Sequence, residues 1–135
     1  MLVNNVGMAQ AGNPDIPSPV NEYRDQGIHN LVTCNMYGQT LLTREIAEGF
    51  KKRFEKTGKR SCITFTSAMA AISPVGIVAL YSATKIFVDF LTWGLGYELK
   101  KFKVDVSSWR AMGVMTNMTE GMTENFMVAT PERYV

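Results

Sequence analysis

The order of apolar segments along the chain constrains the fold more than any other feature. Short β-rich segments at 2–3, 61–65 and 104–109 alternate with longer segments over 22–56 and 79–101. In the longer segments apolar residues recur mostly at helical spacing, and Gly58 stands where the first helix should stop. The resulting order of strand, helix, strand, helix and strand predicts an α/β fold in which helices cover a parallel sheet.

Polar residues follow the predicted strands. Asn4 and Asn5 come after the first strand, Ser67 after the second, and the segment 110–116 after the third. Ligands of parallel α/β sheets collect at the carboxyl ends of the strands. These three segments are therefore expected to meet at one edge of the sheet.

Composition excludes several classes of protein. The chain has 135 residues, of which 46% are hydrophobic and 19% charged, as in one ordinary globular domain. Its two cysteines, Cys34 and Cys62, form no CxxC motif, and His29 is the single histidine, so neither a metal site nor a Ser-His-Asp triad is expected. Two free thiols fit a reducing compartment. We see no signal peptide and no apolar run long enough to cross a membrane, which favours a cytoplasmic location.

Tyr81 and Lys85 form the first candidate catalytic pair. They are four residues apart on a predicted helix and therefore share a face. A phenol is a poor acid–base catalyst near neutral pH, but an ammonium one turn away stabilises the phenolate and lowers the phenol pKa. Such a pair can donate a proton to a carbonyl oxygen or accept one from an alcohol. Taken alone, the same spacing also fits a surface pair of no catalytic importance.

Ser67 and Asn35 are the other candidate catalytic residues. Ser67 ends the strand before the Tyr81 helix, where its hydroxyl could bind a substrate oxygen or act only as a turn residue. Asn35 interrupts an apolar helical stripe. An inward-facing asparagine needs hydrogen-bond partners, so it either holds a water or is a satisfied core amide.

In this order the motifs resemble the short-chain dehydrogenase/reductase family. Residues 4–7 (Asn-Asn-Val-Gly) resemble the family's Asn-Asn-Ala-Gly turn, Asn35 its helix asparagine, residues 66–67 its Ser-Ser, and residues 81–85 its Tyr-x-x-x-Lys. Residues 2–8 and 81–90 are most similar to the branch of very-long-chain 3-oxoacyl-CoA reductases and 17-beta-hydroxysteroid dehydrogenases. The resemblance implies the C-terminal portion of a Rossmann-like doubly wound parallel sheet, with helices on both faces.

The resemblance also implies roles for individual residues. Tyr81 would be the general acid/base, and Lys85 would lower the Tyr81 pKa and bind the nicotinamide ribose. Ser67 would hold the substrate carbonyl, and Asn35 would hold a water in a proton relay. Asn5 would line the adenosine side of the cofactor, while the nicotinamide carboxamide would meet two positions after the last strand, Val114 and Thr116.

The sequence departs from the family pattern in three ways. The glycine-rich phosphate-binding turn is absent, so we expect residues 1–135 to be a partial catalytic domain without the nucleotide-binding βαβ units. Ser67 precedes Tyr81 by 14 residues, against a usual 13 in the family. Ala111 and Met112 replace the family's Pro-Gly, in a methionine-containing segment over 110–135 that we predict to be a substrate-side lid.

Together these features predict an NAD(P)-dependent oxidoreductase that interconverts a ketone and a secondary alcohol. A 3-oxoacyl-CoA or steroid-like substrate and NADPH rather than NADH are favoured by the branch, as is homo-oligomer formation. The branch is often attached to the endoplasmic reticulum, which is the alternative to a cytoplasmic location. A truncated, non-catalytic paralogue that acts through dimerisation is the alternative function. The basic run over 51–60 lacks the aromatic platform of a nucleic-acid module, so no nucleic-acid partner is expected.

Overall fold

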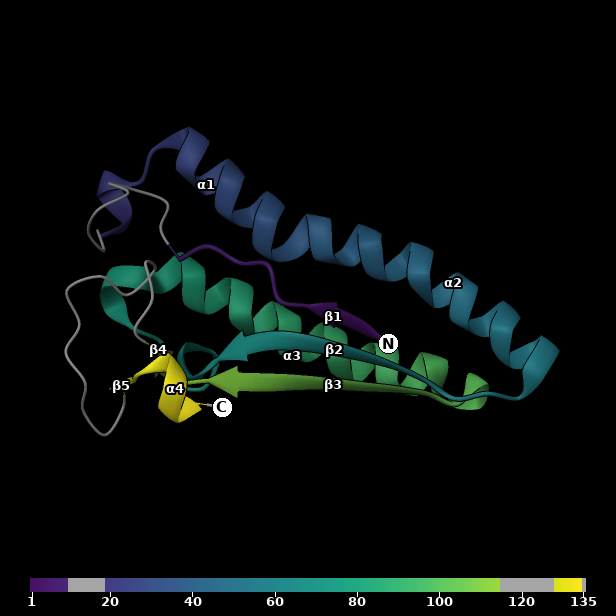
Figure 1. Ribbon diagram of the computed structural model, residues 1–135. Coiled ribbons are helices and arrows are strands. Elements are labelled where there is room, and N and C mark those ends of the chain that lie inside the picture. Colours follow the sequence, from purple (N-terminus) through teal and green to yellow (C-terminus); the bar gives the residue numbers. More distant parts are fainter. Residues whose placement is uncertain (10–18, 115–127, 135) are drawn as a thin grey trace.

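The computed structural model describes residues 1–9, 19–114 and 128–134 (Figure 1). Three strands form the main sheet: β1 (Leu2–Asn4), β2 (Ser61–Ala68) and β3 (Val104–Ala111). The long helical segments are α1 (Asp25–Val32), the π-helical η2 (Thr33–Gly38), α2 (Gln39–Thr57) and α3 (Ala79–Leu99). The shorter elements are η1 (Val20–Glu22), η3 (Met69–Ala71), η4 (Gly76–Val78), η5 (Lys100–Phe102), β4 (Gly113–Val114), β5 (Val128–Ala129) and α4 (Pro131–Tyr134).

The main sheet is parallel throughout, with strand order β1-β2-β3. Asn4 pairs with Phe65, and Ser67 pairs with Arg110, so the carboxyl ends of all three strands lie at the same edge. The α/β class and the parallel sheet predicted from the alternation of segments are thereby confirmed.

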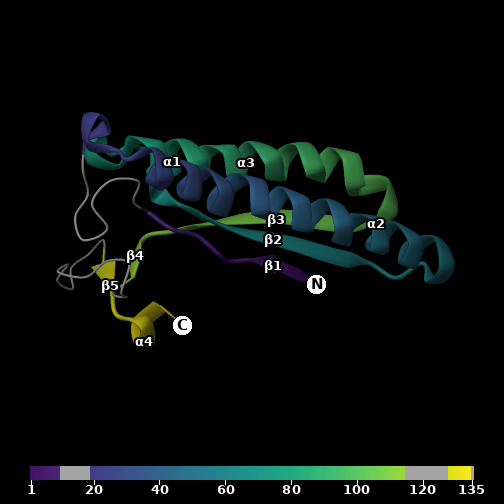
Figure 2. The ribbon, with the colours of Figure 1, turned by 90° about the horizontal axis from the view of Figure 1, so that it is seen from above.

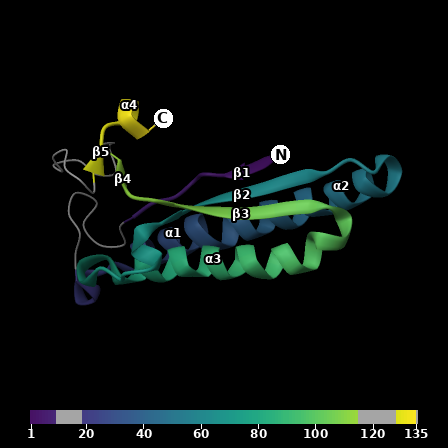
Figure 3. The same cartoon turned by 90° about the horizontal axis from the view of Figure 1, so that it is seen from below.

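Both long helices lie on the same face of this sheet, which differs from the expected cover on two faces (Figures 2 and 3). Parallel crossovers are right-handed. Because the strand order advances in one direction from β1 to β3, the two crossovers place α2 and α3 on the same side. Helices on the second face require a reversal of strand order, and no reversal occurs among the described strands of the main sheet.

The core lies between β2 and the two helices. Alternate residues of β2 are buried, with Ile63 and Phe65 fully covered, while the intervening residues are only half-buried. Val88 and Leu99 of α3 and Ala47 of α2 join the same cluster. Burial of these large side chains contributes roughly 1.5–3 kcal/mol each, which fixes the register that brings the polar strand ends together.

The first predicted helix is divided. Its regular turns on either side are separated by η2, where the backbone widens into π-helical geometry around Asn35. Such π segments occur frequently at functional sites. The helix ends as predicted at Gly58, which adopts a left-handed φ of 66° and donates its N–H to Phe54.

The helical segment Gly76–Phe102 has the length and composition of a membrane-crossing helix, with a mean hydropathy of 1.2. Core helices of globular proteins meet the same criterion. The inner face of this segment packs on β2 and β3, where Val88, Thr92 and Leu99 are buried. Its apolar character is thus explained in part by the core that it covers.

Candidate active site

The side chain of Lys85 is the centre of the polar group at the carboxyl edge. The residue is buried, and its ammonium donates a hydrogen bond to the carbonyl oxygen of Thr66 at 2.9 Å. The turn after β1 approaches from the other side. A Cβ added to Gly7 would lie 3.4 Å from Lys85 Nζ and 3.6 Å from Asn35 Oδ1. These are ordinary van der Waals distances, so the turn passes close to the ammonium and to the Asn35 side chain.

Asn35 joins η2 to the turn and to α3. Its exposed fraction is 0%, and its amide donates to the Met8 carbonyl at 2.8 Å and to the Thr84 hydroxyl at 3.0 Å. Its Oδ1 accepts the Met8 N–H at 2.9 Å. Both amide protons are therefore engaged, which is the arrangement of a satisfied core amide. A water bound at this residue would have to use the remaining acceptor capacity of its side chain or its backbone carbonyl.

Ser67, near the end of β2, is also part of this polar group, but its hydroxyl points into the protein. The residue is 1% exposed, and Oγ donates to the carbonyl oxygen of Lys85 at 3.2 Å. A serine hydroxyl has one proton to donate. In this geometry the proton is engaged within the protein, which fits the structural alternative, and binding of a substrate oxygen by Ser67 stays a prediction. The residue 13 positions before Tyr81, which is the usual spacing in the family, is Ala68.

The ionisation of Tyr81 and Lys85 is governed by burial. Loss of water around the half-buried Tyr81 phenol raises its pKa. Burial lowers the pKa of Lys85, and the nearby Cys34 and Asp89 oppose that change. Lys85 Nζ lies 5.6 Å from the centroid of the Tyr81 ring, with its hydrogen bond given to Thr66. The ammonium thus contacts the ring and the strand end, and burial raises the phenol pKa where the sequence suggested that it would be lowered.

The predicted cofactor residues are placed only in part. Asn5 is exposed at the end of β1, and its Oδ1 accepts a hydrogen bond from the Thr66 hydroxyl at 2.7 Å. Val114 lies in β4, which pairs with β5 in parallel. Thr116, and with it residues 115–127 of the predicted lid, lies outside the described residues.

Asp89 is a neighbour of the site that the sequence did not indicate, and its partner is Arg110. Asp89 lies one turn after Lys85 on α3, and Arg110 is the penultimate residue of β3, paired with Ser67. Arg110 Nε donates to Asp89 Oδ2 at 2.8 Å, and the second carboxylate oxygen is buried without a hydrogen-bond partner. A carboxylate inside an otherwise apolar helical stripe was the available signal. Its partner could not be found without the fold, because 21 residues separate the two in sequence.

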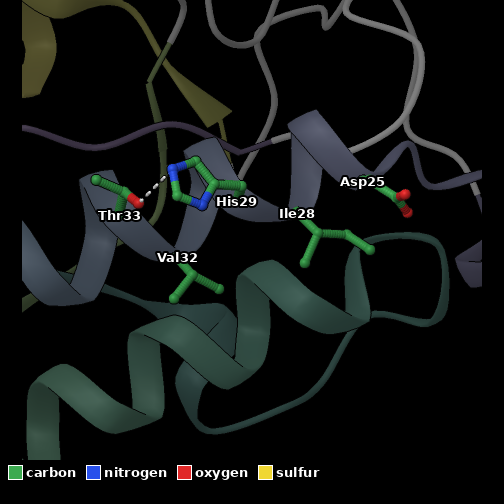
Figure 4. A pocket seen from close by; sticks show the side chains of 5 residues that line it. All are labelled: Asp25, Ile28, His29, Val32 and Thr33. Atoms are coloured by element: carbon green, nitrogen blue, oxygen red, sulfur yellow. Dashed lines mark hydrogen bonds between the residues drawn. The ribbon is translucent and has the colours of Figure 1, made fainter.

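A shallow hollow on α1 is separate from this group (Figure 4). It is lined by Asp25, Ile28, His29, Val32 and Thr33, all from α1 and the residue that follows it. The His29 ring lies 3.5 Å from the Thr33 hydroxyl. No group of three potential metal ligands occurs among the described residues.

The described residues thus form a parallel α/β sheet with Tyr81 and Lys85 on one face of α3, near the buried Asn35. Residues 1–126 match the short chain dehydrogenase family, and the chain belongs to that family. It is 31% identical over its whole length to the very-long-chain 3-oxoacyl-CoA reductase of Anas platyrhynchos, and 29% identical to the 17-beta-hydroxysteroid dehydrogenase type 3 of Danio rerio. The resemblance to this branch is therefore confirmed. The chain spans 41% and 42% of the lengths of these relatives.

Solved structures support the same family. The 3-ketoacyl-(acyl-carrier-protein) reductase of Brucella melitensis, complexed with NADH, has a TM-score of 0.79 and 27% identity. The match covers 87% of this chain and 46% of that protein. A short-chain dehydrogenase from Sphingobium yanoikuyae in complex with NADPH has a TM-score of 0.72 and 30% identity, covering 87% of this chain and 42% of its own.

Proposed function

We propose that this chain carries the proton-transfer half of an NAD(P)-dependent carbonyl reductase or alcohol dehydrogenase. The observation that carries the proposal is the buried Lys85 ammonium against the Tyr81 ring, at the carboxyl edge of a parallel sheet. Similarity to 3-oxoacyl-CoA reductases and a 17-beta-hydroxysteroid dehydrogenase favours an extended apolar ketone, either a 3-oxoacyl-CoA or a steroid-like molecule.

The described residues fit the nicotinamide end of such a cofactor. Lys85 can donate three hydrogen bonds and gives one to Thr66, which leaves two N–H groups for a ribose hydroxyl and the phenol. Asn5 is exposed beside the same strand end. We assign Asn5, Tyr81, Lys85, Val114 and Thr116 to the cofactor, with NADPH favoured by the branch. The sequence given contains no glycine-rich turn to hold the pyrophosphate.

The reduction follows from these positions. The cofactor, when bound, supplies the hydride. The Tyr81 hydroxyl donates its proton to the developing alkoxide, and Lys85 stabilises the phenolate that remains. We propose that Asn35 positions a water that returns a proton toward Lys85. In our proposal Ser67 binds the substrate oxygen only after its hydroxyl leaves the Lys85 carbonyl.

Activation of Tyr81 should require a rearrangement of Lys85. Burial raises the Tyr81 pKa while the ammonium is bonded to Thr66, so the phenol is a weaker acid here than in water. A ribose hydroxyl that recruits the ammonium toward the phenol oxygen would reverse this direction. We therefore expect the chain alone to bind cofactor weakly and to turn over little substrate.

A second candidate function is that of a non-catalytic paralogue that acts by association with full-length partners. The exposed aromatic side chains of α3, Phe90, Trp93 and Tyr97, favour this possibility because they form a patch suited to protein contact. In the reductase, the segment 110–135 would act as a substrate-side lid; a non-catalytic paralogue would not need such a lid.

Titration of NADPH and NADH by fluorescence separates these functions. The chain should be measured alone and together with a glycine-rich βαβ half from a related short chain dehydrogenase. The reductase proposal predicts weak binding alone and cofactor-dependent reduction of a 3-oxoacyl-CoA or steroid ketone in the mixture. A mixture that forms a complex and binds cofactor but reduces no ketone would instead support the non-catalytic alternative.

A further inference from the structure

Positive charge is concentrated at one end of the molecule, opposite the candidate active site. Nine of the 14 Lys and Arg side chains lie within residues 51–60 and 100–103, and we call these nine the basic pole. They come from the end of α2, the turn into β2 and the segment around η5. These elements meet where the strands begin, at the end of the molecule away from the arrowheads of β2 and β3 (Figure 1).

Contacts between the two segments show that the basic pole is one surface. Phe102 lies between the ammonium groups of Lys51 and Lys101, at 5.4 Å and 5.0 Å from its centroid. Lys103 lies 5.8 Å from the ring of Phe54 on α2, and its carbonyl accepts the N–H of Ser61. Residues 42 or more positions apart are therefore brought into one cationic patch.

Nearby carboxylates do not neutralise this patch. Four acidic residues lie in or beside the two segments, at positions 48, 55, 98 and 105, so nine positive and four negative side chains leave an excess of five. The remaining five cations and eight carboxylates give the rest of the chain an excess of three negative charges. Five exposed lysines at positions 56, 59, 100, 101 and 103 form no ion pair with a described carboxylate.

We propose that the basic pole docks the chain on an anionic phospholipid surface. Apart from Arg53, which donates to a backbone carbonyl, the cations of the pole that form no ion pair with a described carboxylate are all lysines, whose compact charges suit many headgroups without requiring one fixed geometry. Both arginines of the pole are engaged, Arg60 with Asp105 at 2.7 Å and Arg53 with the Arg60 carbonyl. The half-buried rings of Phe54 and Phe102 provide an apolar layer beneath the lysine stems.

A nucleic-acid partner fits less well. Stacking of bases needs free aromatic faces. The rings of the pole are half-buried and have ammonium groups over them. A membrane held at the pole would leave the carboxyl edge of the sheet open to solutes.

Flotation with lipid vesicles tests this inference, which does not depend on the proposed reductase function. The chain should float with phosphatidylcholine vesicles that contain about one-third phosphatidylserine, and not with pure phosphatidylcholine. Binding should fall steeply as salt rises from about 0.05 to 0.5 M, because added ions screen exposed charges. No difference between the two kinds of vesicle at low salt would overturn the proposal.

Two double variants locate the surface. Lys101→Gln with Lys103→Gln should lower the partition coefficient at least tenfold, since each lysine near an anionic surface contributes about fivefold. Arg24→Gln with Arg44→Gln removes the same charge elsewhere and should change it less than about twofold. Lys101→Arg with Lys103→Arg should retain binding. Equal losses in both glutamine variants, or displacement from vesicles by equimolar duplex DNA, would contradict a lipid-binding pole.

Discussion

At the scale of single residues, the site depends on buried polar groups that satisfy one another. The Asn35 side chain accepts a hydrogen bond from the Met8 N–H and donates one to the Met8 carbonyl oxygen. It donates a third hydrogen bond to the Thr84 hydroxyl on α3. Removal of such an amide leaves several buried groups without partners. The residue therefore has a structural role in addition to any part in a proton relay.

Asn35→Ala should lower the free energy of unfolding by about 2–4 kcal/mol, because three hydrogen bonds are lost in a fully buried place. Urea unfolding followed by circular dichroism measures this change. Asn30→Ala is the matched control: Asn30 is exposed and accepts one bond from Gln26, so its loss should be within about 0.5 kcal/mol. Equal effects of the two substitutions would contradict the assigned role.

The lowered pKa of Lys85 implies that the stability of the fold depends on pH. Burial makes the folded-state pKa lower than the unfolded value of 10.5, so the unfolded chain binds more protons between the two. Stability attributable to this group must rise as pH increases toward 10.5. The stability of Lys85→Met relative to the parent should therefore decrease as the pH rises toward 10.5, whatever its initial sign. Urea unfolding of the two proteins at a series of pH values measures this trend, and a relative stability that increases with pH would contradict it.

At the scale of elements, much of the arrangement could be predicted and some could not. The β-rich composition of residues 61–65 made β2 recognisable, and the positions of Asn4, Ser67 and Arg110 at the ends of strands correctly placed them at one edge. The handedness of crossovers would have placed α2 and α3 on the same face once the strand order was known. The π segment around Asn35 and the inward hydroxyl of Ser67 depend on tertiary contacts, which local spacing does not specify.

The Asp89–Arg110 pair is the element-scale contact that joins α3 to the end of β3. The Asp89 side chain is 3% exposed and that of Arg110 is 37% exposed, so we expect Asp89→Asn to cost about 2 kcal/mol, less than a fully buried pair. A double-mutant cycle with Arg110→Gln should give a coupling energy above about 1 kcal/mol. The same cycle on the exposed pair Arg60–Asp105 should give a clearly smaller coupling. Additive effects at positions 89 and 110 would show that the contact does not stabilise the fold.

At the scale of the whole molecule, the outer face of α3 carries aromatic side chains that no described residue covers. Phe90 and Trp93 lie on α3 with ring centroids 5.1 Å apart, and both are more than half exposed. Exposed aromatic pairs of this size are typical of protein interfaces. Association through α3 is thus expected, in agreement with the oligomer predicted from the family resemblance.

Phe90→Glu should weaken self-association at least tenfold in sedimentation velocity, because a charge would be desolvated at the contact. Trp109→Glu serves as the control, since Trp109 is a similarly exposed aromatic residue on β3, away from α3. Association that responds to Trp109→Glu and not to Phe90→Glu would move the interface to the open face of the sheet.

The most direct test of the account is the rate of ketone reduction by Tyr81→Phe. The chain is mixed with a glycine-rich βαβ half from a related short chain dehydrogenase, and the loss of NADPH absorbance is followed with a 3-oxoacyl-CoA. Substitution of the phenol should reduce kcat by about 10²–10⁴-fold, while the cofactor still binds. A Tyr81→Phe mixture that reduces the ketone at the parent rate would contradict the assignment of Tyr81 as the proton donor.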